Sequence, residues 1–193
     1  MNEDLMTRVL ESLVITDIVS MGRTCRVMRK IAKGGGTTFE AFLEALQEGK
    51  AIITGSGARA MVTGDVDVEM RDLNIVLPLE SFGTLQDFVV ETLGYVVTSN
   101  ASHPAISTMI THFGKYACDG RIMTIASAGT KMSVLLIILS APSTADMVFM
   151  TTGGVTWFYP QWFGQQVALL SQTGDLVPWE NKLGCAGEFH EGL

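Results

Sequence analysis

The sequence of 193 residues contains 47% hydrophobic and 17% charged residues, and its formal net charge at pH 7 is −7. This composition excludes an intrinsically disordered chain, because there is enough apolar side chain to build one substantial core. The longest apolar run, 134–139, is far shorter than the roughly 20 residues of a membrane-spanning helix. Residues 2–4 (NED) also lack the basic character of a secretory signal. The sequence therefore predicts an intracellular globular protein, cytoplasmic or nuclear, without a membrane span.

The charge is unevenly distributed along the chain. In residues 1–36 apolar residues recur at helical spacing, which predicts an N-terminal helical arm. This arm is basic, and its cationic cluster comprises Arg23, Arg26, Arg29, Lys30 and Lys33. Such a cluster could dock a protein partner, although it is usually only a solvated helix face. The remainder is acidic and repels polyanions, so a nucleic-acid partner is not implied.

The pattern of turn formers divides the chain into three parts. Three consecutive glycines at 34–36 end the arm, because glycine loses the most backbone entropy when a helix forms. Residues 37–170 are expected to form the folded domain. Residues 171–193 contain turn formers and few apolar runs, and are expected to form a C-terminal tail.

Within the domain, helices and strands are expected to follow one another. One-sided apolar spacing predicts helices at about 39–48 and 81–93. Short β-branched or aromatic runs predict strands at 51–54, 73–77, 95–97, 122–126 and 155–159. The apolar run 133–139 is compatible with a buried strand or a helix, since periodicity does not separate the two. These elements predict an α/β (α+β) fold, in which helices pack on a small mixed β-sheet.

A strand that runs into a glycine-serine turn is the first candidate for a binding site. Residues 51–54 lead directly into Gly55, Ser56 and Gly57, after which a further helix is expected to begin. The N–H groups at the start of a helix and a serine hydroxyl can hold a phosphate. Glycine and serine at such a turn also serve geometry alone. Phosphate binding is favoured because acidic residues follow at alternate positions beside a strand, where they point to the same side and can share metal ions.

Two segments resemble the signature of a known family: ITGSGARAM at 53–61 and DLNIVLP at 72–78. They are similar to the Gly-Ser and Asp-x-Asp motifs of the nucleotidyltransferase (DNA polymerase β-like) superfamily, and look closest to a fungal branch with a degenerate active site. The helix FGTLQDFVVETLGY at 82–95 and the segment WFYP at 157–160 also look similar to that branch. The resemblance spans roughly residues 37–160 and implies a nucleotidyltransferase-like fold.

The resemblance also implies roles for individual residues. Gly55, Ser56 and Arg59 would bind the nucleotide, and Asp72 would be a catalytic residue and the first metal ligand. Asn74 occupies the second catalytic and metal-ligand position, where the family has an aspartate. An amide oxygen is an uncharged and weaker ligand for Mg²⁺, the cofactor that the family implies.

Other acidic residues offer alternatives. Asp67 and Glu69 could form the metal-ligand pair instead, but they lack the flanking apolar run of a central strand. The superfamily usually adds a third carboxylate on a neighbouring strand, and residues 122–126 contain none. Asp119, just before that run, is only a weak candidate.

Three functions are compatible with these features. The first is a nucleotidyltransferase that passes a nucleotidyl group from a Mg²⁺-bound nucleoside triphosphate to an unknown hydroxyl acceptor. The second is a catalytically inactive relative that serves as a nucleotide-binding or protein-interaction module, which Asn74 and the missing third acid favour. The third is an unrelated α/β protein in which the motifs are coincidental.

Overall fold

The computed structural model describes residues 36–63, 72–100, 107–163, 167–171 and 174–178. Residues 1–35 of the expected N-terminal arm, with its basic cluster, lie outside the described residues, as do Asp67, Glu69 and most of the expected C-terminal tail, whereas Gly36 begins a helix. Within the described part of the chain, no helix combines the length and the hydropathy needed to cross a bilayer.

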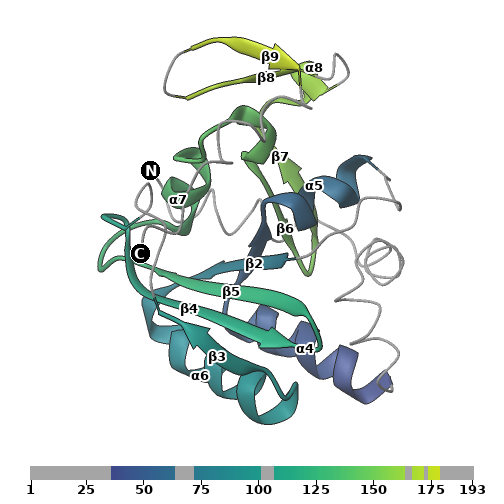
Figure 1. Ribbon diagram of the computed structural model, residues 1–193, viewed down its shortest axis with the longest axis vertical. Coiled ribbons are helices and arrows are strands. Elements are labelled where there is room, and N and C mark those ends of the chain that lie inside the picture. Colours follow the sequence, from purple (N-terminus) through teal and green to yellow (C-terminus); the bar gives the residue numbers. More distant parts are fainter. Residues whose placement is uncertain (1–35, 64–71, 101–106, 164–166, 172–173, 179–193) are drawn as a thin grey trace.

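The described residues contain nine strands, which form one large mixed sheet and one small hairpin (Figure 1). The strands are β1 (Ile52–Thr54), β2 (Asp72–Leu77), β3 (Val96–Ser99), β4 (Ile110–Cys118), β5 (Arg121–Ala128), β6 (Val148–Thr151), β7 (Gly154–Trp157), β8 (Val167–Leu169) and β9 (Leu176–Pro178). The large sheet has the order β3-β4-β5-β2-β1-β6-β7, and β8 pairs with β9. Neighbours pair antiparallel except β2 and β5, which pair in parallel.

Helical segments connect these strands. The α-helices are α4 (Gly36–Glu48), α5 (Ser56–Thr63), α6 (Phe82–Asp87), α7 (Val134–Leu139) and α8 (Pro160–Phe163). The short 3₁₀ segments are η2 (Leu79–Ser81) and η4 (Thr144–Asp146), and a π-helical turn, η3 (Phe88–Thr92), continues α6. The helix expected at 81–93 is therefore present, but its second half is wound as a π-helix.

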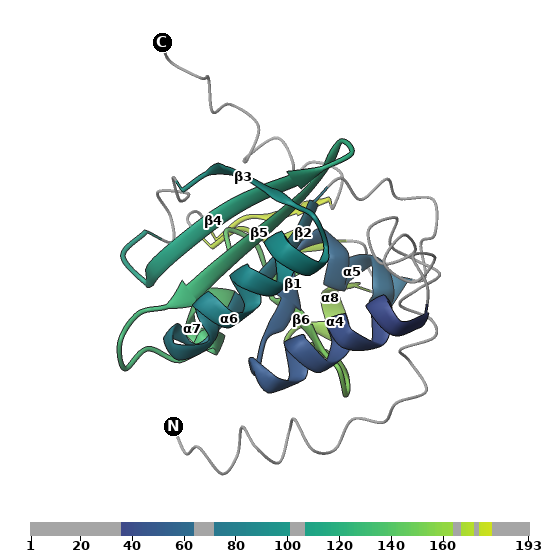
Figure 2. The same ribbon diagram turned by 90° about the horizontal axis from the view of Figure 1, so that it is seen from below.

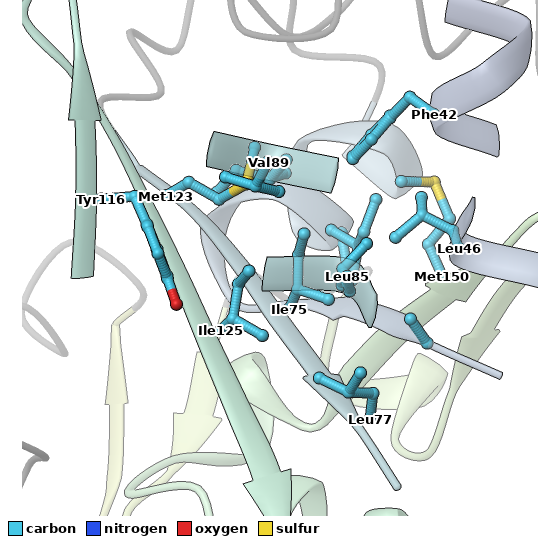
Figure 3. Close-up of a cluster of buried hydrophobic side chains, with 14 of the residues drawn as sticks. Phe42, Leu46, Ile75, Leu77, Leu85, Val89, Tyr116, Met123, Ile125 and Met150 are labelled. Carbon is cyan, nitrogen blue, oxygen red and sulfur yellow. The ribbon is translucent and has the colours of Figure 1, made fainter. Parts of the chain in front are cut away.

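One face of the large sheet is covered by α4, α6 and η3 (Figure 2). Phe42 and Leu46 of α4 are four residues apart, so they lie on one side of that helix, and both are buried. Figure 3 shows the side chains of this cluster gathered between the strands and the helices; the labelled members are Phe42, Leu46, Ile75, Leu77, Leu85, Val89, Tyr116, Met123, Ile125 and Met150. Burial of these side chains is the main apolar contribution to the stability of the domain.

The opposite face is covered by α7. Val134, Ile137 and Ile138 of this helix pack against Val76 of β2 and Phe149 of β6. The helix begins at Ser133, whose hydroxyl accepts a hydrogen bond from the N–H of Leu135 (3.3 Å). That N-cap decides the open question at residues 133–139 in favour of a helix.

The alternation of side chains along β2 positions the candidate site. Leu73, Ile75 and Leu77 belong to the cluster under α4, α6 and η3. The alternate residues Asp72, Asn74 and Val76 therefore lie on the opposite face, which α7 covers. Figure 1 shows α7 near one end of β2 and α5 near the other end. The two polar residues therefore lie at the α5 end of this face.

The mixed α/β fold with helices packed on a β-sheet is confirmed. Strands were correctly expected near β1, β2, β3, β5 and β7, whereas β4, β6, β8 and β9 were not foreseen. Residues 176–178, in the segment expected as a tail, pair with residues 167–169. The first part of that segment is therefore joined to β8 by backbone hydrogen bonds.

We expect Gly114→Ala to destabilise the domain, by about 1–3 kcal/mol, through overpacking. A Cβ at Gly114 would lie 2.3 Å from Tyr116 Oη and 2.6 Å from its Cζ. The Tyr116 ring is 1% exposed and has little room to move. Urea denaturation measures the loss. Gly83→Ala is the matched control, because no atom lies within 4 Å of its Cβ position and alanine favours the helix there. Equal stability of Gly114→Ala and the wild-type chain would contradict this account.

Candidate functional site

The turn between β1 and α5 requires glycine at its first position. Gly55 has a φ of 71°, in the left-handed region that residues with a Cβ rarely adopt. A Cβ there would also lie 3.1 Å from Asn74 Nδ2. The carbonyl oxygen of Gly55 accepts a hydrogen bond from the N–H of Arg59 (3.0 Å), so α5 begins immediately after the strand. The tight turn places Ser56 directly over β2.

The carboxylate of Asp72 is the centre of the site. Ser56 Oγ donates to Asp72 Oδ1 (3.2 Å), and Asn74 Nδ2 donates to Asp72 Oδ2 (3.2 Å). All three side chains are partly buried. Residues that the sequence motifs singled out in two separate segments therefore meet at one point.

A residue that the motifs did not single out completes this hydrogen-bond chain. Because β2 and β5 pair in parallel, Thr124 lies directly beside Asn74. Thr124 Oγ1 donates to Asn74 Oδ1 over 2.6 Å. This bond fixes the amide so that its NH₂ group faces Asp72. Thr124 thus stands on the neighbouring strand, where the family resemblance would place a third carboxylate.

Arg59, the remaining expected nucleotide-binding residue, pairs with a different acid. Its Nη1 lies 3.1 Å from Asp146 Oδ1 in η4, and the two side chains are only 16% and 27% exposed. Ser143 Oγ donates to the other oxygen, Asp146 Oδ2, over 2.8 Å. Burial raises the pKa of Asp146 above its ordinary value, and the Ser143 hydrogen bond and the Arg59 charge act against that shift. No motif marks Asp146, which is why sequence reasoning missed it.

The donor set fits one magnesium ion better than two. Magnesium is bound in proteins through one or two carboxylates together with substrate phosphates and water. Asp72 supplies one such carboxylate, whereas Asn74 turns its NH₂ group to Asp72 and its oxygen to Thr124. The described residues contain no group of three or more His, Cys, Asp or Glu side chains that could hold a metal ion. The described side chains around Asp72 therefore do not by themselves supply the carboxylates of a two-metal centre, and Asp67 and Glu69 lie outside the described residues.

The position of Asp119 is explained by a turn. Asp119 and Gly120 have φ values of 50° and 73° and join β4 to β5. Positive φ at both central residues is typical of a two-residue hairpin turn, and an Asp-Gly pair is favoured there. Asp119 therefore needs no metal to account for its place in the structure.

Comparison with known proteins finds similarity among solved structures. No protein-family model matches the sequence, and no curated protein matches it. A solved structure described as tRNA nucleotidyltransferase complexed with a primer tRNA and an incoming ATP analog is similar over 63% of this chain, with 14% sequence identity and a TM-score of 0.46. The match covers 35% of that chain, so the similarity spans about a third of its length.

We expect Asp146→Asn to change how stability depends on pH. Because the folded-state pKa of Asp146 is raised, this carboxyl stabilises the fold as pH falls through that pKa, and the contribution is lost as pH rises. The free energy of unfolding of the wild-type chain minus that of the variant should therefore be larger at about pH 4 than at about pH 7. Urea denaturation at both values checks this. An identical difference at the two pH values would show that Asp146 titrates normally.

We also expect Asn74→Asp to lower stability at neutral pH, by about 1–2 kcal/mol. The substitution removes the amide donor to Asp72 and places two carboxylates at alternate positions of one strand, where they repel each other. Thermal denaturation in the presence of EDTA measures the effect. Asn74→Ala is the matched control, because it removes the donor without adding charge and should cost less. A variant as stable as the wild-type chain would contradict the proposed repulsion.

Proposed function

We propose that this chain is a nucleotidyltransferase-like protein that binds a nucleoside triphosphate with magnesium and does not transfer the nucleotidyl group. The observation that carries the proposal is the hydrogen-bond chain from Thr124 through Asn74 to Asp72, joined from the other side by Ser56. It unites the glycine-serine turn with the acidic strand, as a shared site requires. The antiparallel pairing of β1 with β2, which sets Thr54 opposite Asn74, brings the turn beside the acidic residue, and the hydrogen bonds between them support a shared site.

The phosphates would lie at the start of α5. Ser56 has a hydroxyl there that can turn from Asp72 to a phosphate oxygen, and Gly55 allows close approach of the backbone. Arg59 follows Ser56 by three residues, so the two side chains lie on one side of the helix. Its guanidinium is a planar donor that matches phosphate geometry. The three residues would hold the triphosphate together.

Asp72 would hold the magnesium ion that accompanies the triphosphate. The ion would neutralise negative charge on the phosphates, so that the acidic body of the protein does not repel the nucleotide. Binding of the cation to Asp72 would replace the hydrogen bonds from Ser56 and Asn74. The displaced Ser56 hydroxyl would then be available to the phosphates.

Nucleotide binding without transfer follows from Asn74 and Thr124, which stand where a second and a third carboxylate metal ligand would be expected. Two-metal phosphoryl transfer needs a second ion that activates the attacking oxygen. At the positions that would hold it, Asn74 and Thr124 carry no charge, and each is already bonded to its neighbour. A neutral amide and a hydroxyl bind a hard divalent cation more weakly than carboxylates do.

Calorimetric titration of the full chain with ATP, CTP, GTP and UTP, each with and without magnesium, tests this proposal. We expect magnesium-dependent binding of at least one nucleotide. Ser56→Ala should weaken it about tenfold through loss of a hydrogen bond to a charged group, and Asp72→Ala should abolish the magnesium dependence. Ser140→Ala and Asp87→Ala are matched controls on exposed positions outside the site, and should bind as the wild-type chain does.

Two results would contradict the proposal. Absence of binding under every condition would remove the nucleotide site. Transfer of label from an α-³²P nucleotide to acceptors in a cell extract, lost in Asp72→Ala, would show that the chain is an active transferase.

A further inference from the structure

The segment that holds Asp146 is a buried, well-anchored part of the fold. Ser143, Thr144 and Ala145 are at most 5% exposed, and Met147 is 7% exposed. The N–H groups of Asp146 and Met147 donate to the carbonyls of Ser143 and Thr144, which closes the 3₁₀ turn. A carboxylate on such a turn has little freedom to move.

The same turn is tied to the β8–β9 hairpin. The N–H of Leu169 donates to Thr144 Oγ1 (3.0 Å), and Ser143 forms an isolated β-bridge with Leu170. The N–H of Ser171 also donates to the carbonyl of Pro142 (2.8 Å). The hairpin therefore helps to hold η4 in position.

From this anchored turn, Asp146 contacts the helix that begins the candidate site. Asp146 Oδ2 accepts from Ser143, while Asp146 Oδ1 accepts from Arg59 Nη1. Arg59 follows Ser56 by three residues on α5, so the two side chains leave the helix on the same side. A guanidinium has five N–H donors in a planar fork, so it can hold a carboxylate on one edge and a phosphate on another.

We propose that Asp146 is a positioning residue for nucleotide binding: it holds the Arg59 guanidinium in the orientation that receives the triphosphate. The inference rests on the proposed function and extends it to an acid far from both sequence motifs. Without Asp146, the arginine side chain would lose the bond that its Nη1 makes, and the ordering that nucleotide binding then requires would weaken affinity. The role does not require Asp146 to touch the nucleotide.

A double-mutant cycle on the full chain tests the inference, with inorganic tripolyphosphate and magnesium as the probe. Tripolyphosphate isolates the phosphate contacts from any contact to the base. We expect Arg59→Ala to weaken binding, and Asp146→Ala to weaken it about 3- to 10-fold. In the Arg59→Ala background, Asp146→Ala should have no further effect, because Asp146 acts through Arg59. Asp146→Asn keeps an oxygen acceptor and should recover part of the affinity, which a general structural defect would not do. It also replaces Asp146→Ala in the cycle if that variant does not fold.

Each alternative outcome is distinguishable. Wild-type binding that Ser56→Ala weakens and that both Asp146 variants leave unchanged would overturn the positioning role and leave the proposed function intact. Equal losses from Asp146→Ala with and without Arg59 would also overturn it, because Asp146 would then act independently. If the wild-type chain binds neither tripolyphosphate nor any nucleoside triphosphate, the proposed function fails and the positioning role fails with it.

Discussion

The candidate site depends on the two hydrogen bonds that the carboxylate of Asp72 accepts. It accepts one hydrogen bond from Ser56 at the start of α5 and one from Asn74 on its own strand. The first bond joins the start of α5 to β2, and the second joins the side chains of Asp72 and Asn74 within β2. Unless both donors are present, a partly buried carboxylate beside the helix start loses the bonds that compensate for its desolvation.

The side chains next to Asp72 on the sheet, Asn74 and Thr124, are neutral and do not repel its carboxylate. A second carboxylate in place of Asn74 would need a cation to offset its repulsion from Asp72, whereas the amide stabilises Asp72 by donating to it. Thr124 holds the amide in this orientation, because it donates to the amide oxygen across the parallel pair of strands. The arrangement is self-consistent without metal, and a single magnesium ion arriving with a triphosphate is compatible with it.

The parts of the fold that the sequence predicted are those with a local signal. The run 51–54 followed by Gly55 and Ser56 indicated a strand, a tight turn and a helix, and the structure has all three. The helix at 81–93 was likewise visible from apolar residues on one side. By contrast, β4 was missed because polar residues such as His112 and Lys115 interrupt it, and Gly114, one of its two buried positions, has no side chain.

Contacts between distant residues explain what the sequence did not predict at the site. Thr124 and Asn74 are 50 residues apart, and Arg59 and Asp146 are 87 apart. Their meeting depends on the parallel pairing of β2 and β5 and on the packing of η4 against α5, neither of which has a local signature. The glycine-serine turn and the acidic strand were predicted to share one site, and the family resemblance named Ser56, Asp72 and Asn74 as its residues.

A count of the bound ions tests whether the site accepts one divalent ion together with a nucleotide. Electron paramagnetic resonance of Mn²⁺ added to the full chain with a nucleoside triphosphate reports both the number of bound ions and any coupling between them. We expect one Mn²⁺ per chain, with no spin coupling to a second ion. Two spin-coupled Mn²⁺ ions per chain would contradict it, because such a pair needs charged ligands where Asn74 and Thr124 stand.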